Sequence, residues 1–339
     1  MGQEMSKYAA AGVNIDAGNE AVSRIKKHAR STFNSNVLTD LGFFGGLYQL
    51  PDDSNKVLVS SVDSVGTKLK LAIALNRHDT VGIDIVNHCI NDIFTCGAAP
   101  LFFMDYLAVA KLDPAQAENI VSGMASACRD AGIALIGGET AELPGLYADG
   151  DYDLVGFVLG MVEKDKVING SGIEAGDGII GLPSSGLHTN GYSLVRKIFG
   201  DDVTNLNKVY PELGRTLGEV LLEPHRCYYN TLKPVLSYIK GMAHITGGGL
   251  IENVPRVIPD GLVTQFDSGE WQVPPIFDLI QKKGGVSWDE MYRVFNMGLG
   301  MVLVCSPVDL DKIKGVIPEA LVVGEVVETK KSDFKVKID

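Results

Sequence analysis

The sequence predicts an α/β fold of the α+β type, in which mixed sheets are divided between two domains. Apolar runs of strand length alternate with amphipathic helical patterns along the 339 residues. Short turns join several strand runs, which favours mixed sheets over a single doubly wound sheet. The stretch 163–178 is polar and rich in glycine, so we expect domains at residues 1–168 and 169–339.

The first half shows two clear helical patterns. Residues 82–96 carry apolar side chains at helical spacing and end at Gly97. Residues 114–131 begin after a plausible N-cap, Asp113, and end before Gly132. We expect a further helix at 19–31, after an extended or mobile arm, and strands at 57–62, 101–110 and 133–136.

The second half continues the alternation. Strands are expected at 179–182 and 300–305, and helices at 194–199, 217–222 and 228–240. The segment 176–181 matches GxGxxG but runs into a strand instead of opening a helix, so we interpret it as a turn.

Composition excludes several classes of protein. With 30 basic and 42 acidic residues, the net charge of −12 argues against nucleic-acid binding by bulk charge. No apolar run reaches the roughly 18 residues of a membrane helix, and no secretory pattern follows Met1. The five cysteines include no CxxC pair, which argues against a metal cluster or a disulfide framework. We therefore expect core thiols, and this also holds for Cys89 and Cys96, which lie near His88 in the sequence. We therefore expect a cytoplasmic, soluble protein.

The segment from Asp63 to Lys68 is the first candidate site. An acid leaves an apolar strand and is followed by Gly66, Thr67 and Lys68. This combination suits a metal-bound polyphosphate, with the carboxylate on Mg²⁺ and backbone N–H groups and Lys68 on phosphate. An ordinary turn with a surface lysine stays an alternative.

Two further acids could share a metal with Asp63. Asp92 lies on the polar stripe of an otherwise apolar helix, where the alternative is a solvated helix face. Glu139 follows Gly138 at an expected strand end, where ligand sites of α/β sheets gather.

Two small-residue loops offer phosphate sites. The segments 184–191 and 244–249 each combine loop N–H groups, a hydroxyl and a histidine before an expected helix. No Gly-Lys dipeptide occurs, which rules out a Walker A loop. Together the five segments indicate an unusual ATP-dependent enzyme, although each alone could be a turn.

These motifs resemble the aminoimidazole ribonucleotide synthetase family, the phosphoribosylformylglycinamidine cyclo-ligases of purine biosynthesis. The wider ATP-binding superfamily carries D-x4-G-A-x-P, matched by Asp92 to Pro100. The runs Gly137–Glu142, His188–Leu194 and His244–Gly249 are similar to the cyclo-ligase itself. The resemblance implies two α/β domains, a homodimer through the N-terminal sheets, and conversion of formylglycinamidine ribonucleotide and ATP to aminoimidazole ribonucleotide, ADP and phosphate.

The resemblance also implies roles for individual residues. Asp63, Asp92 and Glu139 would hold Mg²⁺. The ATP site would add Lys26, Gly66, Thr67, Lys68, Gly97, Ala98 and Gly138. The substrate would contact Ser185, Gly186, His188, Asn190, Gly247, Gly248 and Gly249. His188, Asp92 and Lys26 are the expected catalytic residues, with substrate orientation as the alternative role of His188.

The chain departs from the family pattern at four places. The family usually has Asp-Gly at Asp63-Ser64, Ala-Met at Asn87-His88, an acid at Ala99 and Ser at Thr189. Two superfamily relatives fit less well: no cysteine precedes Cys89, as selenophosphate synthetase needs, and the chain ends in Lys337-Ile338-Asp339 instead of the cysteine of the hydrogenase maturation protein. The formylglycinamidine synthetase is far longer. A non-catalytic nucleotide-binding regulator is the alternative from another class.

Overall fold

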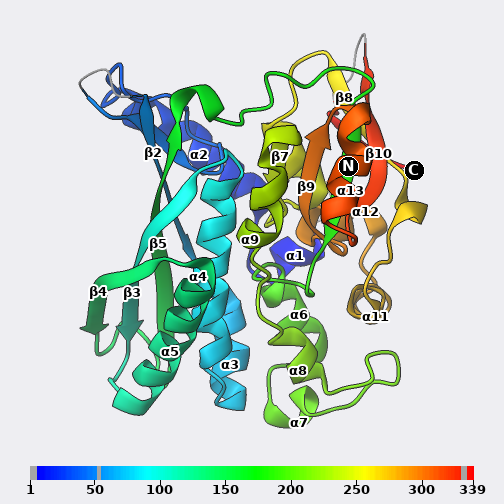
Figure 1. The fold of residues 1–339 in the computed structure, drawn as a ribbon. Helices are drawn as coiled ribbons and strands as arrows, with labels where there is room; N and C mark the ends of the chain where they lie inside the picture. Colours follow the sequence, from blue (N-terminus) through cyan, green and yellow to red (C-terminus); the bar gives the residue numbers. More distant parts are fainter. Residues whose placement is uncertain (1–5, 52–54, 330–333) are drawn as a thin grey trace.

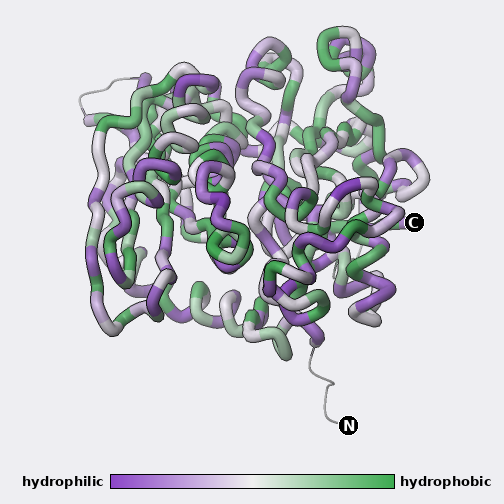
Figure 2. Tube along the Cα trace, turned by 90° about the horizontal axis from the view of Figure 1, so that it is seen from below, coloured by the Kyte–Doolittle hydropathy of each residue, from purple (hydrophilic) through white to green (hydrophobic). Residues whose placement is uncertain are grey.

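The computed structural model describes residues 6–51, 55–329 and 334–339. Two mixed sheets lie side by side, each with its own helices, and the long α4 runs along the boundary between them (Figure 1; Figure 2 gives the view from below). None of the helices in the described residues is long and apolar enough to cross a membrane.

The first sheet has five strands in the order β1-β2-β5-β3-β4. The bounds are β1 Gly46–Gln49, β2 Lys56–Ser64, β3 Ala99–Val109, β4 Ala134–Glu142 and β5 Tyr152–Glu163. Only β3 and β4 pair in parallel. They are connected by α5 (Pro114–Ala131), as a parallel pair requires.

One face of this sheet is covered by α4 (Asp79–Phe94) and α5, which pack closely on each other. A Cβ on Gly82 of α4 would lie 2.1 Å from the carbonyl oxygen of Ile120 on α5. Glycine at this position therefore lets the two helix backbones approach each other.

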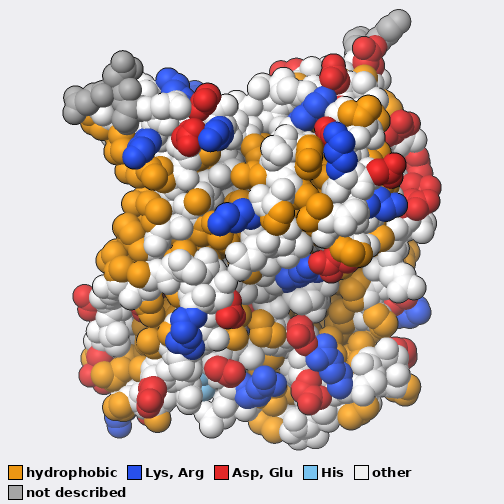
Figure 3. Space-filling view, in the orientation of Figure 1, with side chains coloured by type: hydrophobic (Ala, Val, Ile, Leu, Met, Phe, Trp, Pro, Cys, Tyr) orange, Lys and Arg blue, Asp and Glu red, His pale blue; other side chains and the backbone are white. Residues whose placement is uncertain are grey.

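The opposite face of the first sheet is apolar and exposed. Figure 3 shows hydrophobic side chains gathered along this flank of the molecule. Large apolar side chains that are more than a third exposed come from all five strands: Tyr48, Val62, Met104, Tyr106, Ile136 and Phe157.

The second sheet has six strands in the order β11-β8-β10-β6-β9-β7. The bounds are β6 Gly178–Pro183, β7 Ile239–His244, β8 Leu262–Phe266, β9 Leu299–Cys305, β10 Leu321–Glu328 and β11 Val336–Ile338. Both faces are buried, because Ile180 and Leu182 of β6 join one hydrophobic core and Ile179 joins another. The first of these cores also contains Val59 and Ile93, so it continues into the first sheet and α4.

The other helices are short, apart from α2. Their bounds are α1 Lys7–Ala10, α2 Ile15–Arg30, α3 Leu69–Leu75, α6 Tyr192–Phe199, α7 Val203–Leu206, α8 Leu217–Leu221, α9 Tyr229–Leu232, α10 Gly249–Asn253, α11 Pro275–Gly284, α12 Trp288–Val294 and α13 Leu310–Val316.

The structure confirms the mixed-sheet fold class. The domain boundary after residue 168 stays a prediction, and this position lies in the segment between β5 and β6. The extended or mobile arm expected before residue 19 is wrong where the structure describes it, although residues 1–5 lie outside the described residues. A short helix, α1, is present, and α2 begins four residues earlier than expected. Asn14 caps α2, because its side chain accepts from the N–H of Ala17. The helix expected at 228–240 is also wrong. It ends at Leu232, and a 3₁₀ turn containing Pro234 follows.

Candidate active site

The polar stripe of α4 is buried. Asp84, His88 and Asp92 follow each other at i, i+4 spacing and share one face of the helix. Their exposed fractions are 0%, 3% and 7%. The solvated-face alternative is therefore wrong, and the cost of burying these groups has to be offset by partners.

Part of that offset comes from the segment before α9, where the N–H of His225 donates to Asp84 Oδ1 at 2.6 Å. The same segment also bonds two buried asparagines beside the stripe. Asn87 donates from Nδ2 to the carbonyl oxygen of His225 at 2.7 Å. Asn91 donates from Nδ2 to the carbonyl oxygen of Arg226 at 2.7 Å and accepts from the N–H of Tyr228 at 2.9 Å. These hydrogen bonds join α4 of the first half to the second half of the chain.

Lys68 lies beneath this junction and not along an open nucleotide cleft as expected. Its Nζ lies 2.7 Å from Asp84 Oδ2, and both side chains are fully buried. Nζ also donates to the carbonyl oxygens of His188 and Glu223 at 3.2 and 2.8 Å. Burial lowers the pKa of Lys68 and raises that of Asp84, while the ion pair opposes both shifts. This lysine therefore holds two loops of the site together from below.

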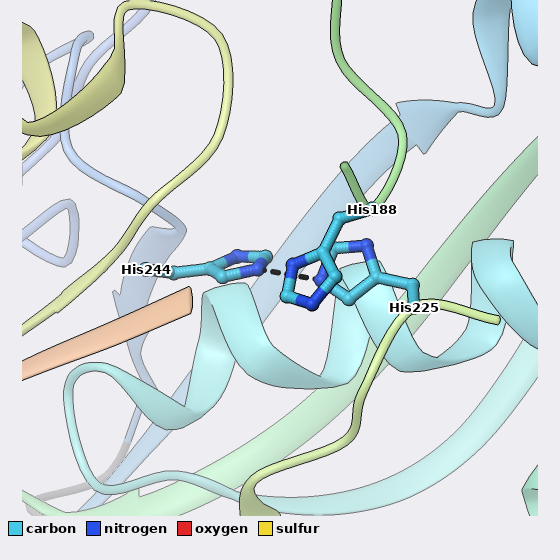
Figure 4. A group of neighbouring side chains, drawn as sticks. All are labelled: His188, His225 and His244. Carbon is cyan, nitrogen blue, oxygen red and sulfur yellow. Dashed lines mark hydrogen bonds between the residues drawn. The ribbon is translucent and has the colours of Figure 1, made fainter. Parts of the chain in front are cut away.

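Three histidines from separate segments meet one another (Figure 4). Backbone hydrogen bonds join two of them to the ion pair, from Lys68 Nζ to the carbonyl oxygen of His188 and from the N–H of His225 to Asp84. The rings of His188 and His225 stack with their centroids 3.9 Å apart, and His225 Nε2 lies 2.9 Å from His244 Nε2. Burial shifts the pKa of His188 and of His225 well below the ordinary value, so both rings are neutral at physiological pH. His188 adopts a left-handed φ of 62°, a strained conformation of the kind that collects at functional sites.

A fourth histidine, His88, lies between two acids. His88 Nε2 lies 2.8 Å from Asp63 Oδ2 at the end of β2 and 3.8 Å from Asp92 Oδ2. On the other side of Asp92, His244 Nδ1 lies 2.8 Å from Asp92 Oδ1. Burial alone would lower the pKa of His88, but Asp63 and Asp92 outweigh it and raise this pKa to about 9. At neutral pH this imidazolium therefore compensates the charge of the acids.

The substrate loops predicted from sequence meet at this cluster. The N–H of Ser185 donates to His188 Nε2 at 3.2 Å, and the carbonyl oxygen of Gly186 accepts from Asn296 at 2.8 Å. Gly247 lies against Asn190, since a Cβ there would be 3.2 Å from Asn190 Oδ1.

Gly248 and Gly249 follow with φ values of +96° and +57°. A Cβ on Gly249 would come within 1.9 Å of the carbonyl oxygen of Tyr292, so this turn requires glycine. The two loops therefore form one wall of the site.

Glu139 and Gly138 lie away from the cluster. The strand end expected at 137–140 is wrong, because β4 continues to Glu142 at the edge of the sheet. Asp63 pairs with Gly156, Gly156 with Asp105, and Asp105 with Gly138. Three strand spacings, about 14 Å, therefore separate the backbones of Asp63 and Gly138. Within one chain, Glu139 cannot share a metal with Asp63.

Gly97 and Ala98 also lie apart from Asp63. Ala99 pairs with Met161 of β5 and Asp63 with Gly156. These partners are five residues apart along β5, about 17 Å. A ligand would have to be as long as an extended nucleotide to touch both places.

Lys26 lines a cavity of about 600 Å³ between the two halves. The lining includes Phe43 and Asn169 and a second cation, Arg256. Lys26 Nζ lies 3.8 Å from Asp40, and the side chain is 34% exposed. Asp92, Glu252 and Asp63 act electrostatically on Arg256 and partly oppose the desolvation that lowers its pKa.

Gly66 and Thr67 are exposed in a 3₁₀ turn that follows β2 and leads into α3. They lie three and four residues from Asp63. They are therefore exposed close to Asp63 in the chain, where a ligand could reach them.

Comparison with known proteins shows which family the chain belongs to. Residues 45–162 match the model of the AIR synthase related protein, N-terminal domain, and residues 174–337 match that of the C-terminal domain. A phosphoribosylformylglycinamidine cyclo-ligase of Trichlorobacter lovleyi is 51% identical, covering 98% of both chains. The one of Thermoanaerobacter sp. strain X514 is 49% identical, covering 95% of this chain and 98% of its own. The chain belongs to the cyclo-ligase family.

Solved structures outside the cyclo-ligase family share the fold. Thiamine monophosphate kinase from Aquifex aeolicus has a TM-score of 0.64 at 16% identity, with 94% of this chain and 96% of that chain covered. The T. maritima PurL complexed with ADP has a TM-score of 0.60 at 16% identity, with 93% of this chain and 46% of that chain covered. At this identity the likeness concerns the fold alone. The cyclo-ligase relatives, at about half identity, decide against the other superfamily members considered from the motifs.

Sequence reasoning missed four residues of the cluster in this cyclo-ligase family member. The sequence interpretation of His88, beside Cys89 and Cys96, gives it no role, and it assigns none to Asp84. The i, i+4 spacing of Asp84, His88 and Asp92 was the available signal, since three polar side chains recur on one face of an apolar helix. His244 belongs to the loop 244–249, which the sequence predicts as a phosphate site, but the sequence gives this histidine no role of its own. His225 lies in a loop without any recognisable sequence motif.

Proposed function

We propose that this chain catalyses the ATP-dependent ring closure of formylglycinamidine ribonucleotide to 5-aminoimidazole ribonucleotide, with release of ADP and phosphate. Half of the residues are identical to cyclo-ligases over nearly the full length of both chains. The observation that carries the proposal is the cluster between the two sheets, in which His88 contacts Asp63 and Asp92. His244 and His225 connect Asp92 to His188.

The chemistry requires activation of an amide oxygen, which is a poor leaving group. The formyl oxygen attacks the γ-phosphorus of ATP and ADP leaves, which gives an iminophosphate. The ribosyl nitrogen then attacks the formyl carbon, the C–O bond breaks, and phosphate departs with the former formyl oxygen. Phosphoryl transfer of this kind depends mainly on positioning and charge stabilisation.

Asp63 and Asp92 are the proposed ligands of a divalent cation on the ATP phosphates. Carboxylate oxygens are the protein ligands that Mg²⁺ prefers, and such an ion neutralises charge that develops on the phosphoryl group. The Asp63 side chain is 40% exposed, so one edge of the cation site faces open space. We place ATP between this site and the cavity lined by Lys26 and Arg256, with these two cations near its phosphates and Gly66, Thr67, Gly97 and Ala98 along its length.

His188 is the proposed polar helper at the substrate. Its Nε2 accepts from the N–H of Ser185, so the neutral ring carries its proton on Nδ1. Nδ1 is buried and has no hydrogen-bond partner within the described residues. We propose that this N–H donates to the substrate, while the loops of Ser185–Asn190 and Gly247–Gly249 hold the phosphate and amidine groups.

We propose a homodimer through the exposed face of the first sheet, as the family resemblance implies. Its large apolar side chains are those that a second copy would cover. Glu139 pairs with Tyr106, so it lies on this same face. In such a dimer Gly138 and Glu139 could complete the ATP and metal site of the second copy.

We place the enzyme in the cytoplasm. The five cysteines are all free, which suits a reducing compartment. The net charge of −12 supports the proposal that its partners are small phosphate ligands and not nucleic acids. We likewise propose no membrane partner.

The direct test is incubation with formylglycinamidine ribonucleotide and ATP, with the amine product assayed by an aromatic amine dye. We expect one product and one phosphate per ATP consumed. ATP binding without substrate-dependent phosphate release would instead favour a non-catalytic nucleotide-binding regulator.

A further inference from the structure

The donor atoms around Asp63 and Asp92 do not match an all-oxygen magnesium site. Two imidazoles lie among the carboxylates: His88 Nε2 is 2.8 Å from Asp63, and His244 Nδ1 is 2.8 Å from Asp92. Ligand atoms of His88, Asp92 and His244 all lie within 4.8 Å of one another, and these residues are buried. Mg²⁺ prefers oxygen ligands, whereas imidazole suits first-row transition metals.

His88 Nε2 is the atom that points to a ligand. It is buried, and no group in the described part of the chain gives it a hydrogen bond of acceptable geometry, although Asp63 lies at ion-pair distance. Two atoms each about 2.1 Å from one metal ion lie about 3 Å apart in octahedral coordination. The 2.8 Å separations from His88 to Asp63 and from His244 to Asp92 are close to that value.

The groups behind the two imidazoles fit metal ligation. His88 Nδ1 lies 2.8 Å from Thr189 Oγ1, and His244 Nε2 lies 2.9 Å from His225 Nε2. When a metal binds, the proton on His88 Nε2 is released to solvent. Each ring can then donate its other N–H to a neighbour, while Nε2 of His88 and Nδ1 of His244 bind the metal. Ser61 donates to Asp92 Oδ2 at 3.1 Å and orients that carboxylate.

We propose that Asp63, His88, Asp92 and His244 form a binding site for a divalent transition-metal ion, of the class of Mn²⁺ or Zn²⁺, in preference to Mg²⁺. The inference rests on the proposed function only in taking Asp63 and Asp92 as metal ligands. The two carboxylates balance the charge of the ion, and two nitrogen ligands set the preference. The half-exposed Asp63 leaves one side of the ion open to a phosphate oxygen.

Zn²⁺ titration of the chelator-treated, tag-free protein, without nucleotide, tests the proposal. We expect one Zn²⁺ per chain, retained in the presence of about a thousandfold excess of Mg²⁺. His88→Met, which restores the residue usual in the family, should weaken Zn²⁺ binding at least ~100-fold. The matched control is His78→Asn, because His78 is also buried but contacts Tyr152 and Asn76 outside the cluster.

A second readout reports the ligand atoms. With Mn²⁺ as the probe, pulsed EPR should show ¹⁴N modulation from bound imidazole, reduced in His88→Met and unchanged in His78→Asn. If His88→Met fails to fold, Asp63→Asn replaces it, since Asp63 is 40% exposed. Zn²⁺ that Mg²⁺ displaces readily, unaltered Zn²⁺ affinity in the variant, or Mn²⁺ without ¹⁴N coupling would overturn the proposal.

The failure of either proposal can be recognised separately. Product formed with MgATP by a protein that binds no Zn²⁺ would leave the cyclo-ligase function standing without the transition-metal site. One tightly bound Zn²⁺ per chain, with no product formed in the presence of any metal, would leave the transition-metal site standing without the cyclo-ligase function.

Discussion

His244 Nδ1 and Asp92 Oδ1 lie 2.8 Å apart, although 152 residues separate them in the chain. Asp92 comes from α4 of the first half, and His244 ends β7 in the second sheet. The cluster therefore exists only when the two halves pack together, so folding of the whole chain and assembly of the site are coupled.

Removing the charge of Asp92 should abolish most activity. We expect Asp92→Asn to lower turnover at least ~100-fold, because cation binding and charge stabilisation in the transition state both weaken. Steady-state kinetics at saturating divalent cation measure this effect. Asp311→Asn, a change of the same kind at an exposed position on α13, should leave turnover unaltered. A near-normal rate for Asp92→Asn would remove this residue from the mechanism.

Breaking the buried ion pair should destabilise the protein. Asp84→Asn leaves the ammonium of Lys68 buried without its counter-charge, which typically costs about 3–5 kcal/mol. The free energy of unfolding in urea should fall accordingly. Replacing both partners by Lys68→Met and Asp84→Leu should recover much of this loss, because no unpaired charge remains.

Glu20→Gln, in the exposed pair with Arg24, is the control and should have little effect. Equal stability of Asp84→Asn and the native chain would contradict the role given to Lys68.

His88 should make stability depend on alkaline pH in the metal-free protein. Burial opposes protonation of this ring, but Asp63, Asp92 and Asp84 favour it, and the pKa in the folded state is raised to about 9 from an ordinary value of about 6.5. The folded state therefore binds the proton more tightly than the unfolded state. The resulting stabilisation is complete below pH ~6.5 and is lost as pH rises through about 9.

Urea unfolding across this pH range, with chelator present, measures the loss. His88→Met should lack the decline that the native chain shows between pH 7 and 9. Curves of the same slope for both proteins would show that His88 is not protonated in the folded state.

A charge on the exposed sheet face should separate the proposed dimer. Val62 is 65% exposed on β2 of that face, and Val62→Lys would place an ammonium in the interface. Sedimentation should give a dimer for the native chain and a monomer for this variant. Val308→Lys, at a 76% exposed valine of the second half, should stay dimeric. A native chain that sediments as a monomer at micromolar concentration would contradict the homodimer.

Local signals predicted most of the elements that place the site. Asp113 and Gly132 bound α5 as expected, because capping chemistry acts over a few residues. The apolar spacing of α4 predicted its length, but not that its polar stripe is buried. That outcome depends on partners more than 130 residues away: the N–H of His225 donates to Asp84, and two carbonyl groups accept from Asn87 and Asn91.

The site was harder to predict than the fold, for the same reason. Lys68 looked like a phosphate ligand because it follows Gly66 and Thr67, yet Asp84 neutralises it inside the protein. Glu139 looked like a third ligand of the same metal, but sheet order places it three strands away. Contacts between distant segments decided these cases, and motif spacing carries no information about them.

The most direct test of the account follows the formyl oxygen. Formylglycinamidine ribonucleotide labelled with ¹⁸O at the formyl group is converted by the native chain in the presence of ATP and divalent cation, and the phosphate is analysed by mass. We predict one ¹⁸O atom in each phosphate released, one ADP and one aminoimidazole ribonucleotide, with no turnover by Asp92→Asn above about 1% of the native rate. Product formed with unlabelled phosphate, or phosphate release without ring closure, would contradict the proposed activation of the formyl oxygen.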